Sequence, residues 1–482
     1  MIPESIKQHK PDGCEIRHKN GHYYVYKVKG FYDRTTHKSK SKSLGCVGQI
    51  YEGLGFVPNK KDKSASVLKT KEYGATKTIM TAGANLFDTL RKCFPSDFIR
   101  IYVLSVLKLL GNLASKDIDT AYAKSAISML LPEVDLSKNT VSTFLSSLSL
   151  ERDGMLEFMK SYIDYKKGGL IFDATSFISN SKSNPFCEKG YAPSNKEKQQ
   201  IRLFYAFDKI DHEPAYFKIV PRNISDKAAF EACIDEIGLK GFTIILDKDF
   251  YSDKNIQLMK NNEFIMPLQG NTSLVPNQIK QFSGYNQVIT NNFTYHNRMV
   301  YFTEIEVQKH NDCKVCIFYD SERRQYLVDS YFKKFMEKDG SLPPEIKKSA
   351  ADDTASFGVT MLLTNMKSIP KNIYMDYKSR WEIEEMFDTH KHTLSFNMNY
   401  ETSCPSQEGW AFIEFLALLL YHKLNRMLIN SGLIKSVSVK ELLYKASTIT
   451  QCNENGVWKI CNMTKPLADV FQSLGVAMES II

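Results

Sequence analysis

Four residues in the later part of the chain combine side chains that could act together on a phosphate. They are Tyr377, Arg380, Glu384 and Lys391, in a stretch without Gly or Pro that follows Pro370, a possible first residue of a helix. At ~100° per residue, all four would share a helical stripe about 60° wide. Such a stripe could combine a metal-binding carboxylate with phosphate-binding cations, and it could equally be a solvated helix face laced with ion pairs.

Two short apolar runs upstream each end in an aspartate. The run Gly168-Gly-Leu-Ile-Phe leads to Asp173, and the run Gly241-Phe-Thr-Ile-Ile-Leu leads to Asp247. Both runs are predicted to be buried strands, because they are short, bounded by glycine and rich in β-branched or aromatic residues. Open α/β sheets bind ligands outside the carboxyl ends of their strands. We therefore expect both carboxylates at one site, although either residue alone could be a turn or cap residue.

Glu384 would bring a third carboxylate to this site from the later helix. Three converging carboxylates repel one another unless a divalent cation neutralises them, and hard oxygen ligands suit Mg²⁺ or Mn²⁺. The residues therefore predict a metal site at Asp173, Asp247 and Glu384.

With these residues the chain resembles the bacterial DDE transposases of the insertion-sequence-four superfamily, whose catalytic domain has a ribonuclease-H-like fold. Their signature is Tyr, two residues, Arg, three residues, Glu, six residues and Lys, and Tyr377 to Lys391 match it at every position. The family's first catalytic Asp lies in a segment similar to Asp173-Ala-Thr. Its second catalytic Asp lies in a segment similar to Asp247-Lys-Asp-Phe-Tyr-Ser. The resemblance covers residues 165 to 480.

The resemblance implies a transposase that binds the terminal inverted repeats of a transposon, cleaves them through a hairpin, and joins the 3′-hydroxyl to target DNA. It implies catalytic, metal-binding roles on two Mg²⁺ or Mn²⁺ ions for Asp173, Asp247 and Glu384. DNA-binding roles fall to Tyr377, Arg380 and Lys391. Synapsis of two ends implies a homodimer. The alternatives are a ribonuclease-H-like nuclease that cuts without joining, and an inactive DNA-binding remnant.

Three further features have two interpretations each. Asp249 stands where the family has glycine, and Asp247 is preferred as the metal ligand because it directly ends the apolar run. Trp381 is interpreted as a core residue, with stacking on a DNA base as the alternative. Cys313 and Cys316 form a CxxC pair without a second pair nearby, which favours a strand carrying two thiols over a zinc site.

The composition is that of a soluble globular protein. The chain has 482 residues, of which 43% are hydrophobic and 24% charged. No run approaches the ~18 apolar residues of a membrane span, and the start lacks an apolar secretory core. We expect a cytoplasmic, nucleoid-associated bacterial protein with reduced thiols.

The positive charge is concentrated at the amino terminus. Residues 1–80 hold 16 Lys or Arg and 7 Asp or Glu, a net charge of +9 that equals the net charge of the whole chain. Alternating residues after His22 and a Lys-Ser repeat after Lys38 predict strands. A basic, β-rich arm would suit contact with DNA phosphates, although it could also be no more than a soluble surface.

The fold expected from these patterns is α/β, with a ribonuclease-H-like catalytic core, a β-rich insertion, a small basic β-rich arm and a helical region. The motifs also predict the order of the domains. The predicted domains are a DNA-binding arm (1–80), a helical DNA-binding or linking region (81–165), the first part of the core (166–272), the β-rich insertion (273–352), the second part of the core (353–430) and a carboxyl-terminal helical region (431–482).

Removing residues 1–80 takes away the whole net positive charge of the chain. We expect the affinity for transposon ends to collapse and the dependence of binding on salt to flatten, because fewer phosphate contacts release fewer counterions. Binding constants measured over a salt series test this. A truncated protein that binds ends with an unchanged salt slope would contradict the DNA-binding arm.

Overall fold

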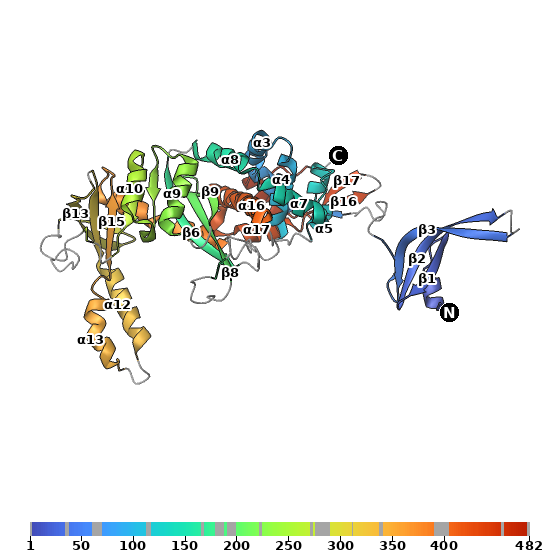
Figure 1. Ribbon diagram of the computed structural model, residues 1–482, viewed down its shortest axis with the longest axis horizontal. Coiled ribbons are helices and arrows are strands. Elements are labelled where there is room, and N and C mark those ends of the chain that lie inside the picture. The colour runs from blue at the N-terminus through green and yellow to red at the C-terminus, as the bar shows by residue number, and fades with distance from the viewer. Residues whose placement is uncertain are drawn as a thin grey trace. The chain divides into compact units, whose positions relative to one another are not determined.

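The structure is a computed structural model that divides the chain into two compact units, Met1–Thr70 and Lys71–Ile482 (Figure 1). It describes residues 2–33, 38–59, 70–111, 117–164, 168–178, 188–189, 199–220, 224–269, 273–274, 290–310, 312–336, 341–389, 404–454 and 457–479.

The smaller unit is a four-stranded antiparallel sheet with the short helix α1 (Glu4–Lys7). Its strands follow chain order: β1 (Cys14–Lys19), β2 (His22–Asp33), β3 (Lys38–Tyr51) and β4 (Gly55–Pro58). Asn20 and Gly21 both have positive φ, 51° and 80°, which is the conformation of a tight hairpin turn between β1 and β2. The first half of β3, with its alternating Lys and Ser, is exposed. The strands predicted after His22 and Lys38 are thereby confirmed.

The larger unit is built on a ten-stranded mixed sheet. Its order is β12-β13-β14-β15-β11-β10-β6-β8-β7, and β9 pairs with β8. Its strands are β6 (Gly169–Ile178), β7 (Glu188–Lys189), β8 (Gln199–Asp208), β9 (Glu213–Val220), β10 (Thr243–Ile245), β11 (Glu263–Pro267), β12 (Asn292–Tyr295), β13 (Arg298–Glu306), β14 (Lys314–Asp320) and β15 (Val359–Thr364). β6, β10 and β11 are parallel neighbours, and the other pairings are antiparallel. The unit is therefore mixed α/β, as the sequence predicts.

Helices precede, separate and follow the strands of this sheet. They are α2 (Gly74–Ala82), α3 (Ala84–Cys93), α4 (Phe98–Gly111), α5 (Ile118–Lys124), α6 (Ile127–Leu130), α7 (Lys138–Leu148), α8 (Arg152–Asp164), α9 (Asp226–Ile237), α10 (Asp253–Leu258), α12 (Ser321–Phe335), α13 (Pro344–Asp353), α14 (Pro370–Lys378), α15 (Trp381–Asp388), α16 (Cys404–Asn430), α17 (Val439–Ala446) and α18 (Lys465–Ser473). None of the helices within the described ranges has the length and apolar character that a membrane crossing needs.

Helix α16 is the central helix of a group of packed helices in the larger unit. Its residues from Trp410 to Leu420 are almost all fully buried, as expected of a helix that is apolar on every face. α4 and α7 pack against it (Figure 1). At Gly409, an added Cβ would lie 2.2 Å from the carbonyl oxygen of Leu145, so glycine is required where α7 and α16 approach.

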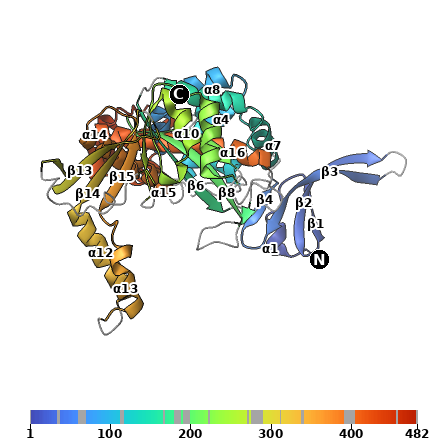
Figure 2. The ribbon, with the colours of Figure 1, turned by 60° about the vertical axis from the view of Figure 1, so that its left-hand side comes forward.

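The segment predicted to be an inserted subdomain is continuous with the sheet. β12, β13 and β14 add to the edge formed by β15. α12 and α13 then project together from these strands (Figure 2). Arg324 joins the base of the pair by donating to the carbonyl oxygens of Thr354 and Phe357, at 3.1 and 3.2 Å.

The carboxyl-terminal region differs from its predicted helical form. Besides α17 and α18 it contains a hairpin of β16 (Thr450–Glu454) and β17 (Val457–Cys461), and β16 also pairs with β5 (Thr70–Glu72). Trp458 lies within β17, and this hairpin completes a small sheet with a strand from the start of the larger unit. Such distant pairing leaves no local trace in the sequence.

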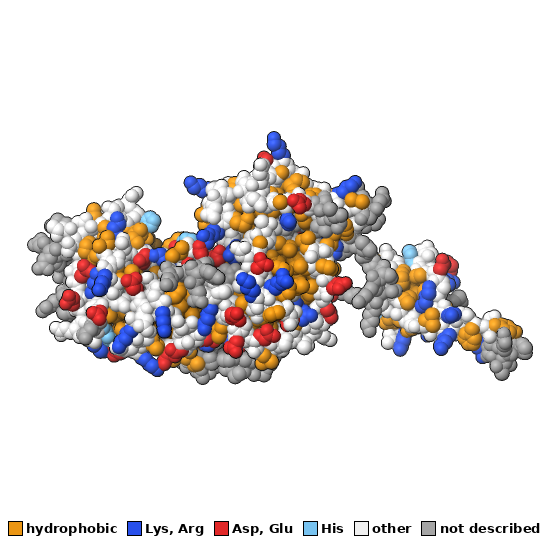
Figure 3. Space-filling model, turned by 90° about the horizontal axis from the view of Figure 1, so that it is seen from above, with side chains coloured by type: hydrophobic (Ala, Val, Ile, Leu, Met, Phe, Trp, Pro, Cys, Tyr) orange, Lys and Arg blue, Asp and Glu red, His pale blue; other side chains and the backbone are white. Residues whose placement is uncertain are grey.

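The larger unit carries both signs of charge over its surface. Beyond residue 80 the chain has 47 basic and 47 acidic residues. Figure 3 shows Lys and Arg side chains interspersed with Asp and Glu side chains on one face of this unit. A local excess of charge in this unit therefore arises only where side chains of one sign lie close together.

Candidate active site

Asp173 lies within a strand, not at its end as the sequence predicts. β10 pairs with β6 only as far as Ile171, but β8 continues to pair with β6 and places Tyr205 opposite Asp173. β6 therefore runs on to Ile178. Leu170, Ile171 and Phe172 before it are fully buried, so the predicted buried run is confirmed while its end is wrong.

Asp247 follows the neighbouring parallel strand at the same height. Ile245 of β10 pairs with Ile171 of β6, and each Asp comes two residues later. Asp247 begins a 3₁₀ turn at Lys248–Phe250, and its Oδ1 accepts a hydrogen bond of 2.7 Å from the backbone N–H of Lys248. The parallel register therefore brings the two carboxylates side by side, as predicted.

The segment of the signature residues is two helices, whereas the sequence predicts one uninterrupted helix. α14 ends at Lys378 and α15 begins at Trp381. The hydroxyl of Ser379 donates to the carbonyl oxygen of Asp376 at 2.7 Å, and the N–H of Arg380 turns instead to the carbonyl of Tyr377 at 3.1 Å. This competition of a serine hydroxyl with the backbone tightens the turn. The helix therefore changes course just at Arg380.

Arg380 is the centre of the site. Its Nη1 lies 3.2 Å from Oδ2 of Asp173 and 3.5 Å from Oδ2 of Asp247, and its Nη2 lies 2.8 Å from Oε1 of Glu384. The arginine side chain is 15% exposed, while that of Glu384 is 60% exposed. One guanidinium thus holds the three carboxylates that the sequence predicts to converge.

Burial and charge shift the pKa values of these groups. Burial raises the pKa of Asp173 to about 6, although the charge of Arg380 opposes this rise. Burial alone would lower the pKa of Arg380, but Asp173, Asp247 and other neighbours raise it overall. Burial also raises the pKa of Tyr377. Ionised Asp173 is therefore costly to the folded protein, and Arg380 offsets part of that cost.

The carboxylates fit a divalent cation in donor type and in charge. If all three are ionised, the contacts set three negative charges against one guanidinium. Carboxylate oxygens are the ligands that Mg²⁺ and Mn²⁺ prefer. Within the described ranges no three acidic, His or Cys side chains are close enough to hold one ion in the present arrangement. The guanidinium occupies the space between the carboxylates, so an ion would have to compete with it for their oxygens.

Other residues singled out in the sequence are placed as follows. Asp249 is exposed in the 3₁₀ turn, and the structure gives the Arg380 contact to Asp247. Tyr377 lies in the last turn of α14 beside this group, and Lys391 lies outside the described residues. Cys316 is buried within β14 and Cys313 just before it, and burial raises the pKa of the Cys316 thiol to about 12.

The interpretation of Trp381 as a core residue is wrong, because its side chain is 56% exposed. It lines a hollow of about 230 Å³ together with Tyr421 and His422 of α16. The reason lies in the turn at Ser379: α15 starts anew there and buries Ile383, Met386 and Phe387 instead.

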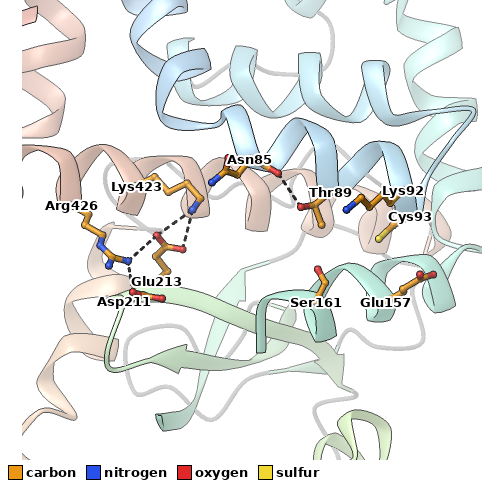
Figure 4. Close-up of a pocket in the computed structure, with 10 residues that line it drawn as sticks. All are labelled: Asn85, Thr89, Lys92, Cys93, Glu157, Ser161, Asp211, Glu213, Lys423 and Arg426. Atoms are coloured by element: carbon orange, nitrogen blue, oxygen red, sulfur yellow. Dashed lines mark hydrogen bonds and ion pairs between the residues drawn. The ribbon is translucent and has the colours of Figure 1, made fainter. Parts of the chain in front are cut away.

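A second cavity, of about 420 Å³, lies between α3, α8 and α16 (Figure 4). Lys423 contacts both carboxylate oxygens of Glu213 at 3.3 Å, and Arg426 pairs with Asp211. No local sequence pattern indicates these ion pairs, because they join segments that are distant in the chain. They fix the turn between β8 and β9 to α16 and are not among the signature residues.

Comparisons with known proteins bear on this site. The family model described as "Transposase DDE domain" matches residues 164–420, more than half of the chain. No curated protein gives a significant match. Among solved structures, one similar chain is from the cryo-EM structure of the piggyBac transposase synaptic complex with hairpin DNA, at 10% identity and a TM-score of 0.41, covering 73% of this chain and 70% of that chain.

Replacing Asp173 by Asn should stabilise the metal-free protein at neutral pH. The folded state raises the pKa of Asp173 from 3.8 to about 6. The wild type therefore loses stability as the pH rises through that range, and the Asn variant does not. We expect a gain of about 1–3 kcal/mol at pH 7, since a pKa difference of one is worth about 1.4 kcal/mol.

Urea unfolding of both proteins in EDTA at pH 4 and pH 7 measures this gain, with exposed Asp249→Asn as the matched control. A gain that is equal at both pH values would contradict the assignment of the cost to ionised Asp173.

Proposed function

We propose, from the premise that the chain belongs to the transposase DDE domain family, that it cuts DNA at the ends of a mobile element and joins the freed end to target DNA. The observation that carries this proposal is the convergence of Asp173, Asp247 and Glu384 on one guanidinium. The three carboxylates come from segments that are far apart in the chain. Burial makes the ionised form of Asp173 costly at this point, which is typical of an active site.

We further assign the chain to the insertion-sequence-four superfamily of bacterial transposases, because its Tyr-Arg-Glu-Lys spacing matches that signature. A ribonuclease-H-like core is supported by the order around β6, with antiparallel β8 on one side and parallel β10 on the other. In this proposal residues 166–272 and 353–430 form the core, 273–352 the insertion, and 1–80 and 81–165 bind or link DNA.

In the proposed mechanism Asp173, Asp247 and Glu384 would hold the divalent ions. When bound, such ions lower the pKa of a water and stabilise the leaving oxygen of a phosphodiester. Arg380 keeps the three carboxylates together and counters their repulsion until the site is filled. Tyr377 and Lys391 are proposed to contact phosphates of the bound strand. Arg380 can also turn part of its fork to a phosphate, since its Nη atoms point at the same space as the carboxylates.

The proposed partners are double-stranded DNA and a second copy of the chain. Terminal inverted repeats come in pairs, so a homodimer would hold one at each active site. Cleavage through a hairpin needs the freed 3′-hydroxyl to attack the opposite strand, and joining needs it to attack target DNA. Both are transesterifications that the same carboxylates can serve.

The decisive experiment is incubation with Mg²⁺ and a duplex that carries the terminal inverted repeat flanking this gene. Hairpinned ends and strand-transfer products support the proposal. Nicks without joined products would instead show a nuclease, and binding without nicks would show an inactive DNA-binding protein.

Replacing Asp173, Asp247 or Glu384 by Ala should abolish cleavage, with a loss of at least about a thousandfold, because each removes a ligand of the ions that stabilise the transition state. Binding of the ends should remain within about threefold, since positioning contacts to phosphates lie elsewhere. Cleavage and gel-shift assays measure the two effects. Asp249→Ala is the control, and loss of cleavage there with retention in Asp247→Ala would show that Asp249 is the ligand.

Replacing Arg380 by Gln should tighten the binding of metal ions while slowing cleavage. The guanidinium competes for the carboxylate oxygens, and one unit charge at 4 Å is worth about 4 kcal/mol at an effective dielectric of 20. We expect Mn²⁺ to bind at least about tenfold tighter without DNA, as measured by calorimetry. Lys371→Gln, an exposed residue of α14, is the control. Equal Mn²⁺ affinity of wild type and Arg380→Gln would show that the guanidinium does not compete with metal.

A further inference from the structure

Three cations gather beside the candidate active site, and the motifs do not account for them. They are Arg298 at the start of β13, Arg323 in the first turn of α12 and Lys378 at the end of α14. Nη1 of Arg298 lies 3.2 Å from Oδ2 of Asp320, and Oδ1 of Asp320 accepts the backbone N–H of Arg323 at 2.8 Å. We call Arg298, Arg323 and Lys378 the basic cluster.

Two members of the basic cluster lie over an aromatic platform. Nζ of Lys378 lies 4.8 Å from the ring centroid of Tyr374, and the guanidinium of Arg298 lies 5.8 Å from that of Tyr295. The two tyrosine rings pack against each other at 5.3 Å, and Tyr374 is 1% exposed. Cations over packed rings have little freedom to move apart, so Arg298 and Lys378 are in place before any ligand arrives.

Among the residues that the structure describes, the basic cluster has more positive charge than its surroundings neutralise. Asp320 contacts the cluster, pairs with Arg298 and caps α12. The side chains of Arg323 and Lys378 make no ion pair or side-chain hydrogen bond with any residue in the described part of the chain. Burial and the charge of Arg323 lower the pKa of Lys378 to about 8. Their donors are available to an anion.

The basic cluster adjoins the carboxylate site through Tyr377. Lys378 is the next residue in the chain, and its Nζ lies 5.9 Å from the centroid of the Tyr377 ring. The pKa of Tyr377, raised first by burial, also responds to Arg380 and Asp247, and to Arg323 of the cluster. Tyr377 therefore lies near both groups.

We propose that Arg298, Arg323 and Lys378 bind a phosphodiester group of the DNA strand that enters the candidate active site. This proposal rests on the proposed function. Three carboxylates against one guanidinium repel a polyanion, so a strand that enters the site needs a nearby attraction. Arginine presents a planar fork to phosphate oxygens, and lysine adds a point charge. Arg323 is exposed and the Arg298 side chain is 30% exposed, so a strand can reach both.

The test removes two of these charges and compares the result with a matched pair. The double variant Arg323→Gln, Lys378→Gln is set against Lys333→Gln, Lys371→Gln, which removes two exposed lysines from the same helices, α12 and α14. Affinity for a terminal-repeat duplex is measured in EDTA over a salt series. We expect the cluster variant to bind at least about tenfold more weakly, with a salt slope smaller by about 1–2, because each phosphate contact contributes ~0.9.

Equal affinities and slopes for the two double variants would overturn the proposal. Because Lys378 is half-buried, thermal unfolding of each variant is measured as well. If Lys378→Gln unfolds, Arg323→Gln alone, at an exposed position, is compared with Lys333→Gln alone. We expect that single variant to bind at least about threefold more weakly than its control, and equal affinities would again overturn the proposal.

A scan of neutral methylphosphonates along the duplex then locates the contact. We expect one position, or two adjacent positions, at which neutralising the phosphate removes the difference between wild type and the cluster variant. If the difference persists whichever phosphate is neutralised, the cluster acts through its general electrostatic field, and the proposed contact is overturned. Competition by millimolar inorganic phosphate at the cluster alone, without any effect of methylphosphonates, would show a small-anion site instead.

Failure of this proposal is distinguishable from failure of the proposed function, because binding in EDTA involves no cleavage. A wild type that binds the duplex but makes no nick with Mg²⁺ would contradict the proposed function and leave the comparison of the two double variants valid.

Discussion

The contact of one guanidinium with three carboxylates is the interaction on which the candidate site depends. Without Arg380, Asp173 and Asp247 would lie side by side at the edge of two parallel strands with Glu384 nearby, and their charges would push them apart. Burial already makes the ionised form of Asp173 unfavourable. The guanidinium therefore supplies from within the chain the positive charge that any such cluster needs. This charge counters the repulsion of the carboxylates in the metal-free protein, and an ion that bound there would compete with Arg380 for the same oxygens.

Two features of the fold bring these groups together. The parallel register of β6 and β10 fixes the two aspartates at one height, and it is held by a fully buried run of apolar residues on both strands. The turn between α14 and α15 sets the third component. There the hydroxyl of Ser379 donates to the carbonyl oxygen of Asp376, and the N–H of Arg380 donates to the carbonyl oxygen of Tyr377. This tightens the backbone turn and directs the side chain of Arg380 toward the two aspartates. Glu384 then follows one helical turn later, at the spacing that suits an arginine–glutamate pair.

Much of this site can be predicted from the sequence, because the patterns that indicate its residues are local. Asp173, Asp247 and Glu384 can be selected from short apolar runs and from helical spacing, and the pairing of Arg380 with Glu384 is visible at i, i+4. The contacts of Arg380 with Asp173 and Asp247 join segments that are far apart in the chain, so no local pattern reveals them.

The differences from the sequence-based expectations have equally specific causes. β6 extends beyond its apolar run because the antiparallel strand β8 continues to pair with it. Trp381 is exposed because the hydroxyl of Ser379 alters the phase of the helix. The β16–β17 hairpin depends on β5 from the start of the larger unit, a partner that the local sequence around Trp458 cannot indicate.

The distribution of charge follows from what the proposed reaction requires. A carboxylate site that must hold cations is a poor place for a polyanion, so the attraction for DNA has to be supplied by other parts of the chain. Residues 1–80 carry the whole net positive charge, and such a segment gives affinity without determining where a strand lies. The chain beyond residue 80 is neutral in sum, so its contribution must come from small groupings that are fixed in place. Arg298, Arg323 and Lys378 are one such grouping, and two of them, Arg298 and Lys378, lie over packed tyrosine rings. In this arrangement the charge of the amino-terminal segment would gather the DNA and the fixed charge would align one phosphate, because alignment at a carboxylate cluster needs cations that cannot relax toward it.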